Sequence, residues 1–217
     1  MKAESVLRLV VDSTAPDPAV LERAAGAIRA GGIVVVPTDT LYGLAADPFS
    51  AQAVRRLFSI KDRALDRALP LIAADVAQIV AQLGDLSPLA RLLAERFWPG
   101  PLTLLVPAPG AMAPEVSGGT GCVGVRVPAH AVARGVCRAS GGVLTATSAN
   151  ISGRQATGDP EEVVASLGPH VDILLDAGKT EGGLPSTIVD VSALEPRLVR
   201  HGVIPWETVV SCLRRDG

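Results

Sequence analysis

The residues of this chain most able to do chemistry are positively charged side chains gathered where an anion could bind. Lys61, Arg63 and Arg67 lie close together in one short polar segment. Cations at such spacing repel one another unless water solvates them or an anion lies among them. A solvated surface loop is the simpler interpretation of these three residues alone, and an anion site is the alternative.

Two arginines within apolar strands favour the anion site. Arg126 lies in the sequence GVRVP and Arg200 in LVRHG, each within or at the end of an apolar run. A guanidinium that is buried without a partner is costly, so each position indicates a nearby anion.

The stretch 33–44, IVVVPTDTLYGL, combines a buried strand with a polar turn. Its β-branched start is typical of a strand buried on both faces, and the run stops at Pro37. Thr38, Asp39 and Thr40 follow at once. In open α/β sheets ligands bind at such strand ends. The alternative is that these side chains only satisfy the backbone groups of a turn.

A second apolar run, 143–147, leads in the same way into Ser148 and Asn150. Both side chains could face the cavity that the first stretch faces. An ordinary Asx or Ser turn at the start of the next loop is again the alternative.

Alternating strands and helices must position these groups. Strands are predicted at 6–11, 33–36, 69–73, 102–106, 123–127, 143–147, 173–175, 187–191 and 197–200. Helices are predicted at 17–30, 50–60, 75–83, 88–97, 130–139, 160–167 and 206–214. The last three strands follow one another without a helix, so part of the sheet is antiparallel. The predicted fold class is α/β: a twisted, mixed parallel/antiparallel sheet flanked by helices, with an open cavity at the strand ends.

Composition excludes several classes of protein. With 217 residues and 48% hydrophobic content the chain can bury one sizeable core, and we expect a single domain over residues 1–217. Aromatic residues make up only 3%, which argues against stacking platforms for single-stranded nucleic acid. The net charge of -2 makes any nucleic-acid contact local, because a protein that grips a polynucleotide usually carries a basic excess.

The three cysteines, Cys122, Cys137 and Cys212, are widely spaced and odd in number. This pattern fits neither a disulfide framework nor a zinc site, so we expect free thiols in a reducing, cytoplasmic compartment. The N-terminus lacks the apolar core of a signal peptide, and no apolar run is long enough to cross a bilayer.

No metal site or familiar nucleotide motif competes with the anion site. His130, His170 and His201 have no acidic or cysteine neighbours at metal-ligand spacing, so no protein-held metal is expected. Neither a P-loop nor a Rossmann fingerprint follows a predicted strand. A nucleotide, if bound, is bound in another way.

Seven segments in order resemble the YrdC-like threonylcarbamoyl-AMP synthase family. They are VVVPTDTLYGLAAD, FSIKDRALDRALPLIA, FWPGPLTLLVPA, VGVRVPAH, TATSANISG, PSTIVDV and LVRHGVI. Lys61 and Arg63 match the family's KxR pair, and Ser148 and Asn150 match its SxN pair. The resemblance runs from about Ala24 to Pro205. It implies a YrdC-like fold in the short, single-domain form, with no additional C-terminal domain.

The resemblance implies synthesis of L-threonylcarbamoyladenylate and pyrophosphate from L-threonine, bicarbonate and ATP. The product serves the t6A37 modification of tRNA, so transient contact with the tRNA threonylcarbamoyl transferase machinery is expected. Weak tRNA binding is compatible with this role, and no membrane partner is implied. Mg2+ is expected to arrive with ATP, with no organic cofactor.

The family pattern also assigns roles to individual residues. Lys61 and Arg63 are the expected catalytic pair. L-Threonine is assigned to Thr40, Arg126, Ala146 and Ser186, and ATP to Lys61, Arg63, Arg67, Ser148, Asn150, Ala156 and Arg200. Asp39 stays undecided between turn bonding and the threonine amine, while Tyr42 and Gly43 are expected to shape the cavity wall.

Two positions depart from the family pattern. Cys122 stands where a threonine is expected, which leaves only its backbone contact to the nucleotide. Ala64 replaces a proline after Arg63, which implies a looser loop.

Two other functions fit the same fold. One is a module that binds double-stranded RNA or tRNA, against which the low net basicity argues. The other is a paralogue that transfers a carbamoyl group from another donor. The presence of Lys61, Arg63, Arg126, Ser148 and Asn150 together favours the synthase.

Overall fold

The computed structural model describes residues 6–62, 68–153 and 155–213. Its strands are β1 (Leu7–Val10), β2 (Val34–Val36), β3 (Gly43–Ala45), β4 (Leu71–Ile72), β5 (Leu102–Pro107), β6 (Cys122–Arg126), β7 (Leu144–Thr145), β8 (Thr147–Ser148), β9 (Ile173–Asp176), β10 (Thr187–Asp190) and β11 (Arg197–Arg200). Its helices are α1 (Pro18–Arg29), α2 (Ala51–Lys61), α3 (Val76–Leu83), α4 (Pro88–Phe97), α5 (Ala131–Ser140), α6 (Pro160–Leu167) and α7 (Trp206–Leu213), with 3-10 turns η1 (Pro114–Ser117) and η2 (Gly168–His170).

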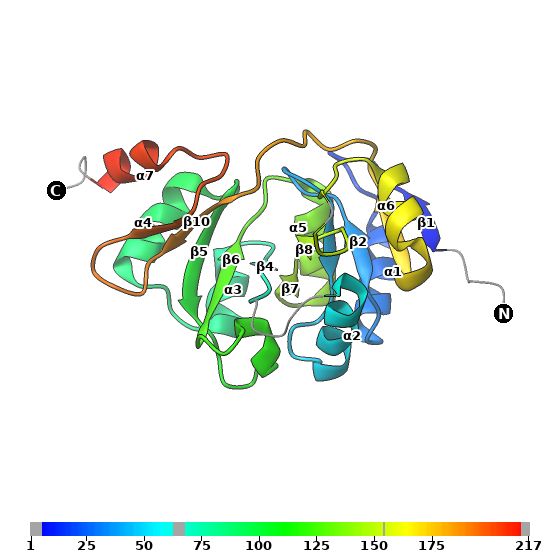
Figure 1. Cartoon of the computed structure of the whole chain (residues 1–217), viewed down its shortest axis with the longest axis horizontal. Coiled ribbons are helices and arrows are strands. Elements are labelled where there is room, and N and C mark those ends of the chain that lie inside the picture. Colours follow the sequence, from blue (N-terminus) through cyan, green and yellow to red (C-terminus); the bar gives the residue numbers. More distant parts are fainter. Residues whose placement is uncertain (1–5, 63–67, 154, 214–217) are drawn as a thin grey trace.

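The strands form two sheets that lie beside each other (Figure 1). One has five strands in the order β1-β9-β2-β3-β8, and the other has six in the order β11-β10-β5-β6-β4-β7. Both combine parallel and antiparallel pairs: β2 is parallel to β9 but antiparallel to β3, and β5 is parallel to β10 but antiparallel to β6. The predicted mixed pairing is therefore confirmed, but the strands form two sheets and not one.

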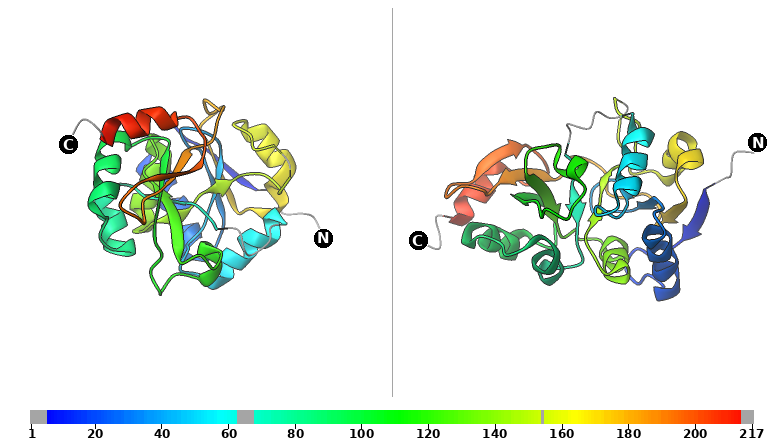
Figure 2. Two further views of the ribbon diagram at one scale, coloured as in Figure 1. Left: turned by 60° about the vertical axis from the view of Figure 1, so that its left-hand side comes forward. Right: turned by 90° about the horizontal axis from the view of Figure 1, so that it is seen from below.

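Helices cover both faces of the five-stranded sheet because β2 is apolar on both sides. Val34 and Val36 pack in one buried cluster with residues of α1 and α5. Ile33 and Val35 face the other way and pack with residues of α2 and α6. Figure 2 shows α1 and α5 on one side of this sheet and α2 and α6 on the other.

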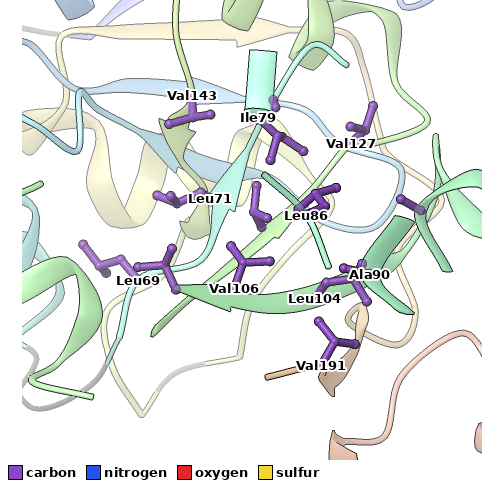
Figure 3. Close-up of a cluster of buried hydrophobic side chains, with 14 of the residues drawn as sticks. Leu69, Leu71, Ile79, Leu86, Ala90, Leu104, Val106, Val127, Val143 and Val191 are labelled. Atoms are coloured by element: carbon purple, nitrogen blue, oxygen red, sulfur yellow. The ribbon is translucent and has the colours of Figure 1, made fainter. Parts of the chain in front are cut away.

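The six-stranded sheet is covered by helices on one face, where alternate residues of its strands enter the largest buried cluster. Leu102, Leu104 and Val106 of β5 pack there with residues of α3, α4 and α7. Figure 3 shows Leu104 and Val106 in this cluster together with Leu86 and Ala90. The opposite face of the sheet, which carries the intervening residues, is left for the site.

The chain passes from one sheet to the other at Ala146. The predicted strand 143–147 divides there, because β7 pairs with β4 and β8 pairs with β3. Successive amides of an extended chain point to opposite edges. Accordingly Thr145 N donates to Ala46 O at 3.0 Å and Ala146 N donates to Pro70 O at 2.8 Å. One short segment thus joins the two sheets.

Asp172 fixes α2 against β2. One carboxylate oxygen, Oδ2, accepts from Ile33 N at 2.7 Å and from Arg56 Nη1 at 2.7 Å. Ser50, at the predicted start of this helix, caps α2 by accepting from Ala53 N at 3.3 Å. Because Lys61 is the last residue of α2, this attachment also sets the position of Lys61.

Candidate active site

A cavity of about 470 Å³ lies between the two sheets. The uncovered face of the six-stranded sheet supplies Thr103, Leu105, Gly124, Arg126 and Ile188, and β11 supplies Arg200. The five-stranded sheet supplies Gly43 and Ser148. The cavity therefore sits at the junction of the sheets, with cationic and hydroxyl groups in its wall.

Arg126 is held by an internal anion and by two hydroxyls. Its Nη1 lies 2.8 Å from Asp39 Oδ1, and its Nη2 donates to Thr38 Oγ1 and Thr40 Oγ1, each at 3.2 Å. Burial lowers the pKa of Arg126, and the charge of Asp39 opposes that change. The anion that the sequence pattern indicated is thus supplied in part by the chain itself.

His130 lies within the electrostatic reach of this ion pair. Burial lowers the pKa of His130, and the Asp39 carboxylate counteracts the shift. Asp39 Oδ2 and His130 Nδ1 are both buried and have no hydrogen-bond partner among the described residues. One oxygen of the Asp39 carboxylate therefore accepts from Arg126, while the other has no hydrogen-bond donor among the described residues.

Arg200 extends over the cavity from the edge strand β11. Its Nε and Nη2 donate to the carbonyl oxygen of Ser186, at 3.2 and 2.7 Å, and Nη2 also donates to Ser186 Oγ at 3.1 Å. Burial of the guanidinium and repulsion by Arg126 lower the pKa of Arg200. Two arginines that repel each other across one cavity favour an anionic ligand.

Gly202 lets β11 approach the segment before β10. A Cβ atom at this position would overlap Pro185 O and the backbone of Ser186 and Thr187. Only a residue without a side chain fits so close to another backbone. This approach allows Arg200 to reach Ser186.

Lys61 is buried, with 3% of its surface exposed, and binds the turn that follows β8. Its Nζ donates to Ser148 O at 2.6 Å, to Asn150 O at 2.9 Å and to Asn150 Oδ1 at 3.1 Å. Ser148 Oγ also donates to Asn150 Oδ1 at 2.5 Å. Lys61 of the KxR pair therefore meets both residues of the SxN pair in one hydrogen-bonded cluster.

Tyr42 ties the polar turn after β2 to the segment after β9. Its hydroxyl donates to Gly178 O at 2.7 Å and accepts from Ala177 N at 3.2 Å. Burial raises the pKa of Tyr42 to about 12, so it stays a neutral donor. Thr180 Oγ1 donates to Thr40 O at 2.9 Å, which adds a second tie. The wall around Thr40 is held from two sides.

Most of the site residues predicted from the sequence come together. Seven line the cavity: Thr40, Arg126, Ala146, Ser148, Ala156, Ser186 and Arg200. Tyr42 and Gly43 also line it, as expected. Lys61 and Asn150 join it through Ser148. Arg63, Arg67 and Ala64 lie outside the described residues.

Two local expectations need correction. Lys61 ends a helix as a buried side chain and does not stand in a charged loop. Arg200 lies on the edge strand β11, and the residue is exposed. The free-energy cost predicted for burying an arginine inside a strand therefore does not arise for the residue as a whole. The backbone contact of Cys122 to the nucleotide stays a prediction, and Cys122 is not among the residues that line this cavity.

Sequence reasoning missed Thr103 and left Asp39 undecided. Thr103 lies within an apolar strand, LTLLV, and its single hydroxyl forms no motif with its neighbours. The alternation of side chains along a strand could have identified it. Thr103 and Leu105 face the cavity, while Leu102 and Leu104 face the core. The pairing of Asp39 with Arg126 joins residues far apart in the chain and has no local signal.

The described residues contain neither a cluster of metal ligands nor a helix that could span a membrane. No group of three or more histidine, cysteine, aspartate and glutamate side chains within 6–62, 68–153 and 155–213 is arranged to hold a metal ion. In the same part of the chain, none of the helices has the length and apolar character needed to span a membrane.

Comparison with known proteins found related sequences over most of the chain. The Sua5/YciO/YrdC family model, described as telomere recombination, matches residues 26–202. A threonylcarbamoyl-AMP synthase of Pyrococcus abyssi is 37% identical over 186 residues, which are 86% of this chain and 55% of that protein. A putative threonylcarbamoyl-AMP synthase of Mycobacterium tuberculosis is 38% identical over 193 residues, covering 89% of this chain and 88% of the relative.

A solved structure supports the same relationship. The crystal structure of P. abyssi Sua5 complexed with L-threonine is 33% identical to this chain and superposes with a TM-score of 0.88. The match covers 94% of this chain and 61% of the Sua5 chain. The chain thus spans little more than half of the P. abyssi protein and most of the M. tuberculosis relative.

Proposed function

Because this chain belongs to the Sua5/YciO/YrdC family, we propose that it is an L-threonylcarbamoyladenylate synthase. In this proposal it forms threonylcarbamoyl-AMP and pyrophosphate from L-threonine, bicarbonate and ATP. The product serves t6A modification of tRNA and passes to the transferase machinery by transient contact. The reaction takes place in the cytoplasm, where the three free cysteines stay reduced.

The observation that carries the proposal is that two arginines, Arg126 and Arg200, line one cavity whose wall also contains hydroxyl groups. A free amino acid brings a carboxylate, for which a guanidinium is the suited partner. Thr40 and Ser186 add hydroxyls that can bond the other polar atoms of threonine. Ala146 contributes its main chain at the point where the sheets meet.

The nucleotide is proposed to bind along the turn after β8. Ser148 and Asn150 face the α-phosphate and ribose, with Ala156 beside them and Arg200 against the adenylate. Lys61 holds this turn, and Arg63 and Arg67 surround the triphosphate. Mg2+ is bound by the triphosphate itself, and the Asp39 carboxylate is already paired with Arg126.

The proposed reaction needs positioning more than proton transfer. Bicarbonate takes up a proton and loses water to give carbon dioxide; the neutral threonine amine adds to it and releases one proton to solvent, which gives a carbamate. One carbamate oxygen attacks the α-phosphorus of ATP. The bond from that phosphorus to the bridging oxygen breaks, and pyrophosphate leaves. Fixed cations and donors stabilise the charge on the phosphate oxygens and hold the two reactants in line.

A threonine-dependent pyrophosphate assay tests the proposal. Purified protein with ATP, Mg2+ and bicarbonate should release pyrophosphate only when L-threonine is added. L-Alanine, which lacks the hydroxyl and the γ-methyl group of threonine, serves as the matched control and should support little release. ATP turnover that is indifferent to threonine contradicts the proposal, as does RNA binding that falls with salt while threonine and ATP leave no binding signal.

A further inference from the structure

Thr103 and Ser186 form a hydrogen-bonded hydroxyl pair in the cavity wall. Their Oγ atoms lie 2.8 Å apart, and the two residues are 2% and 8% exposed. Ser186 Oγ also accepts from Arg200 Nη2 at 3.1 Å. Ser186 thus stands between a hydroxyl on β5 and a guanidinium on β11.

The direction of each proton follows from what each oxygen can do. A hydroxyl donates one hydrogen bond and accepts two. Thr103 Oγ1 has Ser186 Oγ as its one partner among the described residues, and Thr103 is almost fully buried. The contact allows either oxygen as the donor, but an unsatisfied buried donor is costly, so the arrangement that satisfies the more buried hydroxyl has Thr103 donating to Ser186. Ser186 then accepts twice, from Thr103 and Arg200, and its own proton must find another acceptor.

Packing fixes the rotamer of Thr103 that makes this arrangement possible. Gly124 on the neighbouring strand β6 leaves room for the Thr103 methyl group: a Cβ atom there would lie 2.9 Å from Thr103 Cγ2. With the methyl group against Gly124, the hydroxyl is held toward Ser186. The pair is therefore preorganised before a ligand binds.

We propose that Thr103 is a positioning residue that turns the hydroxyl proton of Ser186 into the cavity, toward an acceptor oxygen of the amino-acid substrate. Without the Thr103 hydroxyl, the Ser186 hydroxyl would donate its hydrogen bond to other acceptors for part of the time. Thr103 acts through Ser186 and does not touch the substrate. The inference rests on the proposed function, since threonine is the ligand it names.

Two substitutions at position 103 separate the hydroxyl from the shape of the side chain. Thr103→Val keeps both branches and removes the hydroxyl, and the KM for threonine should rise about three- to tenfold, part of the effect of a hydrogen bond to a charged group. The KM for ATP should stay within about twofold. Thr103→Ser keeps the hydroxyl and should restore most of the threonine KM. If the threonine KM rises less in Thr103→Val than in Thr103→Ser, the inference is overturned, because the loss of packing would then be the cause.

Ser117→Ala is the matched control for loss of a buried hydroxyl. Among the described residues Ser117 Oγ has one hydrogen bond, donated to Pro114 O at 3.0 Å, and Ser117 is not part of the cavity lining. This variant should lose stability comparable to that lost by Thr103→Val while its threonine KM is unchanged. A threonine KM that tracks the melting temperature in both variants contradicts a positioning role.

A double-mutant cycle decides whether Thr103 acts through Ser186. Ser186→Ala alone should raise the threonine KM about tenfold or more. Adding Thr103→Val to Ser186→Ala should change it no further, because the proton to be directed is absent. An additional rise in the double variant would mean that Thr103 binds substrate itself, and would overturn the inference. If the wild-type protein shows no threonine-dependent release, the proposed function fails first, and direct threonine binding by calorimetry then tests the hydroxyl pair alone.

Discussion

Arg126 and Asp39 form an ion pair in which Nη1 and Oδ1 lie 2.8 Å apart, and the two side chains are only 8% and 11% exposed. The pair joins β6 to the polar turn after β2, so the cation that faces the cavity is oriented by a carboxylate of the chain. A buried pair of this kind contributes little net stability when complete, but it is costly to break.

Asp39→Asn should therefore destabilise the fold strongly. The amide has nearly the shape of the carboxylate but leaves the buried Arg126 charge uncompensated, which costs about 3–5 kcal/mol in comparable cases. Urea denaturation measures the loss. Asp85→Asn breaks the surface pair with Arg91 and should cost less than about 1 kcal/mol. Equal effects of the two substitutions would show that the cavity pair is screened by water.

Lys61→Met should suppress pyrophosphate release by about 100-fold while the protein stays folded. The substitution removes the ammonium that binds the Ser148 and Asn150 carbonyl groups, so the turn that we assign to the nucleotide loses its fixed shape. Steady-state kinetics and circular dichroism check both parts. Lys179→Met, which breaks only an exposed pair with Asp159, should leave activity unchanged. Full activity of Lys61→Met removes this lysine from its proposed role.

Asp172→Asn should make the protein less stable at pH 7 but not at low pH. Burial raises the pKa of Asp172, yet hydrogen bonds from Arg56 and Ile33 N outweigh burial and hold that pKa below its usual value. Its contribution is therefore full above the unfolded pKa of about 3.9 and is lost as pH falls through the lower folded pKa. At pH 7 the loss should be about 1–2 kcal/mol, for the hydrogen bonds alone.

Thermal melts of wild type and Asp172→Asn at several pH values between neutrality and pH 3 measure this difference. Asp85→Asn again provides the surface control. A difference in stability that grows as the pH falls would have the wrong sign and would contradict the assigned partners.

Cys137 should be unreactive in the native protein. Burial raises the pKa of its thiol, and the residue has no exposed surface, whereas Cys122 and Cys212 are partly exposed. Thiolate is the reactive form, so a thiol reagent at pH 8 should modify only the two partly exposed cysteines. Cys137→Ser should leave the native count unchanged and lower the count by one in denaturant. Native modification of Cys137 would indicate local opening of α5.

The sequence predicted most of the secondary structure because the deciding signals are local. Asp17 and Ser50 cap helices where their position before an apolar run indicates. The family prediction is also confirmed by the family model that matches residues 26–202 and by the M. tuberculosis relative. The KxR and SxN pairs that led to it are short patterns that can be read in a single sequence. The assignment of individual residues to threonine or ATP stays a prediction.

The errors concern interactions between distant parts of the chain. A run of apolar residues over 143–147 gives no hint that its two ends belong to different sheets, because that depends on which partners Thr145 N and Ala146 N find. In the same way, no local pattern pairs Asp39 with Arg126 or turns Lys61 inward. Partner choice is set by tertiary packing, which periodicity does not encode.

The close approach at Gly202 makes this residue a mutational weak point of the protein. Alanine is the mildest change available there, yet its methyl group would push β11 away from Pro185 and Ser186. The same shift would carry Arg200 off the Ser186 carbonyl. A position whose own atoms bind nothing would then show the phenotype of a binding-site variant. In natural variation, change at 202 should be as rare as change at Arg200 itself.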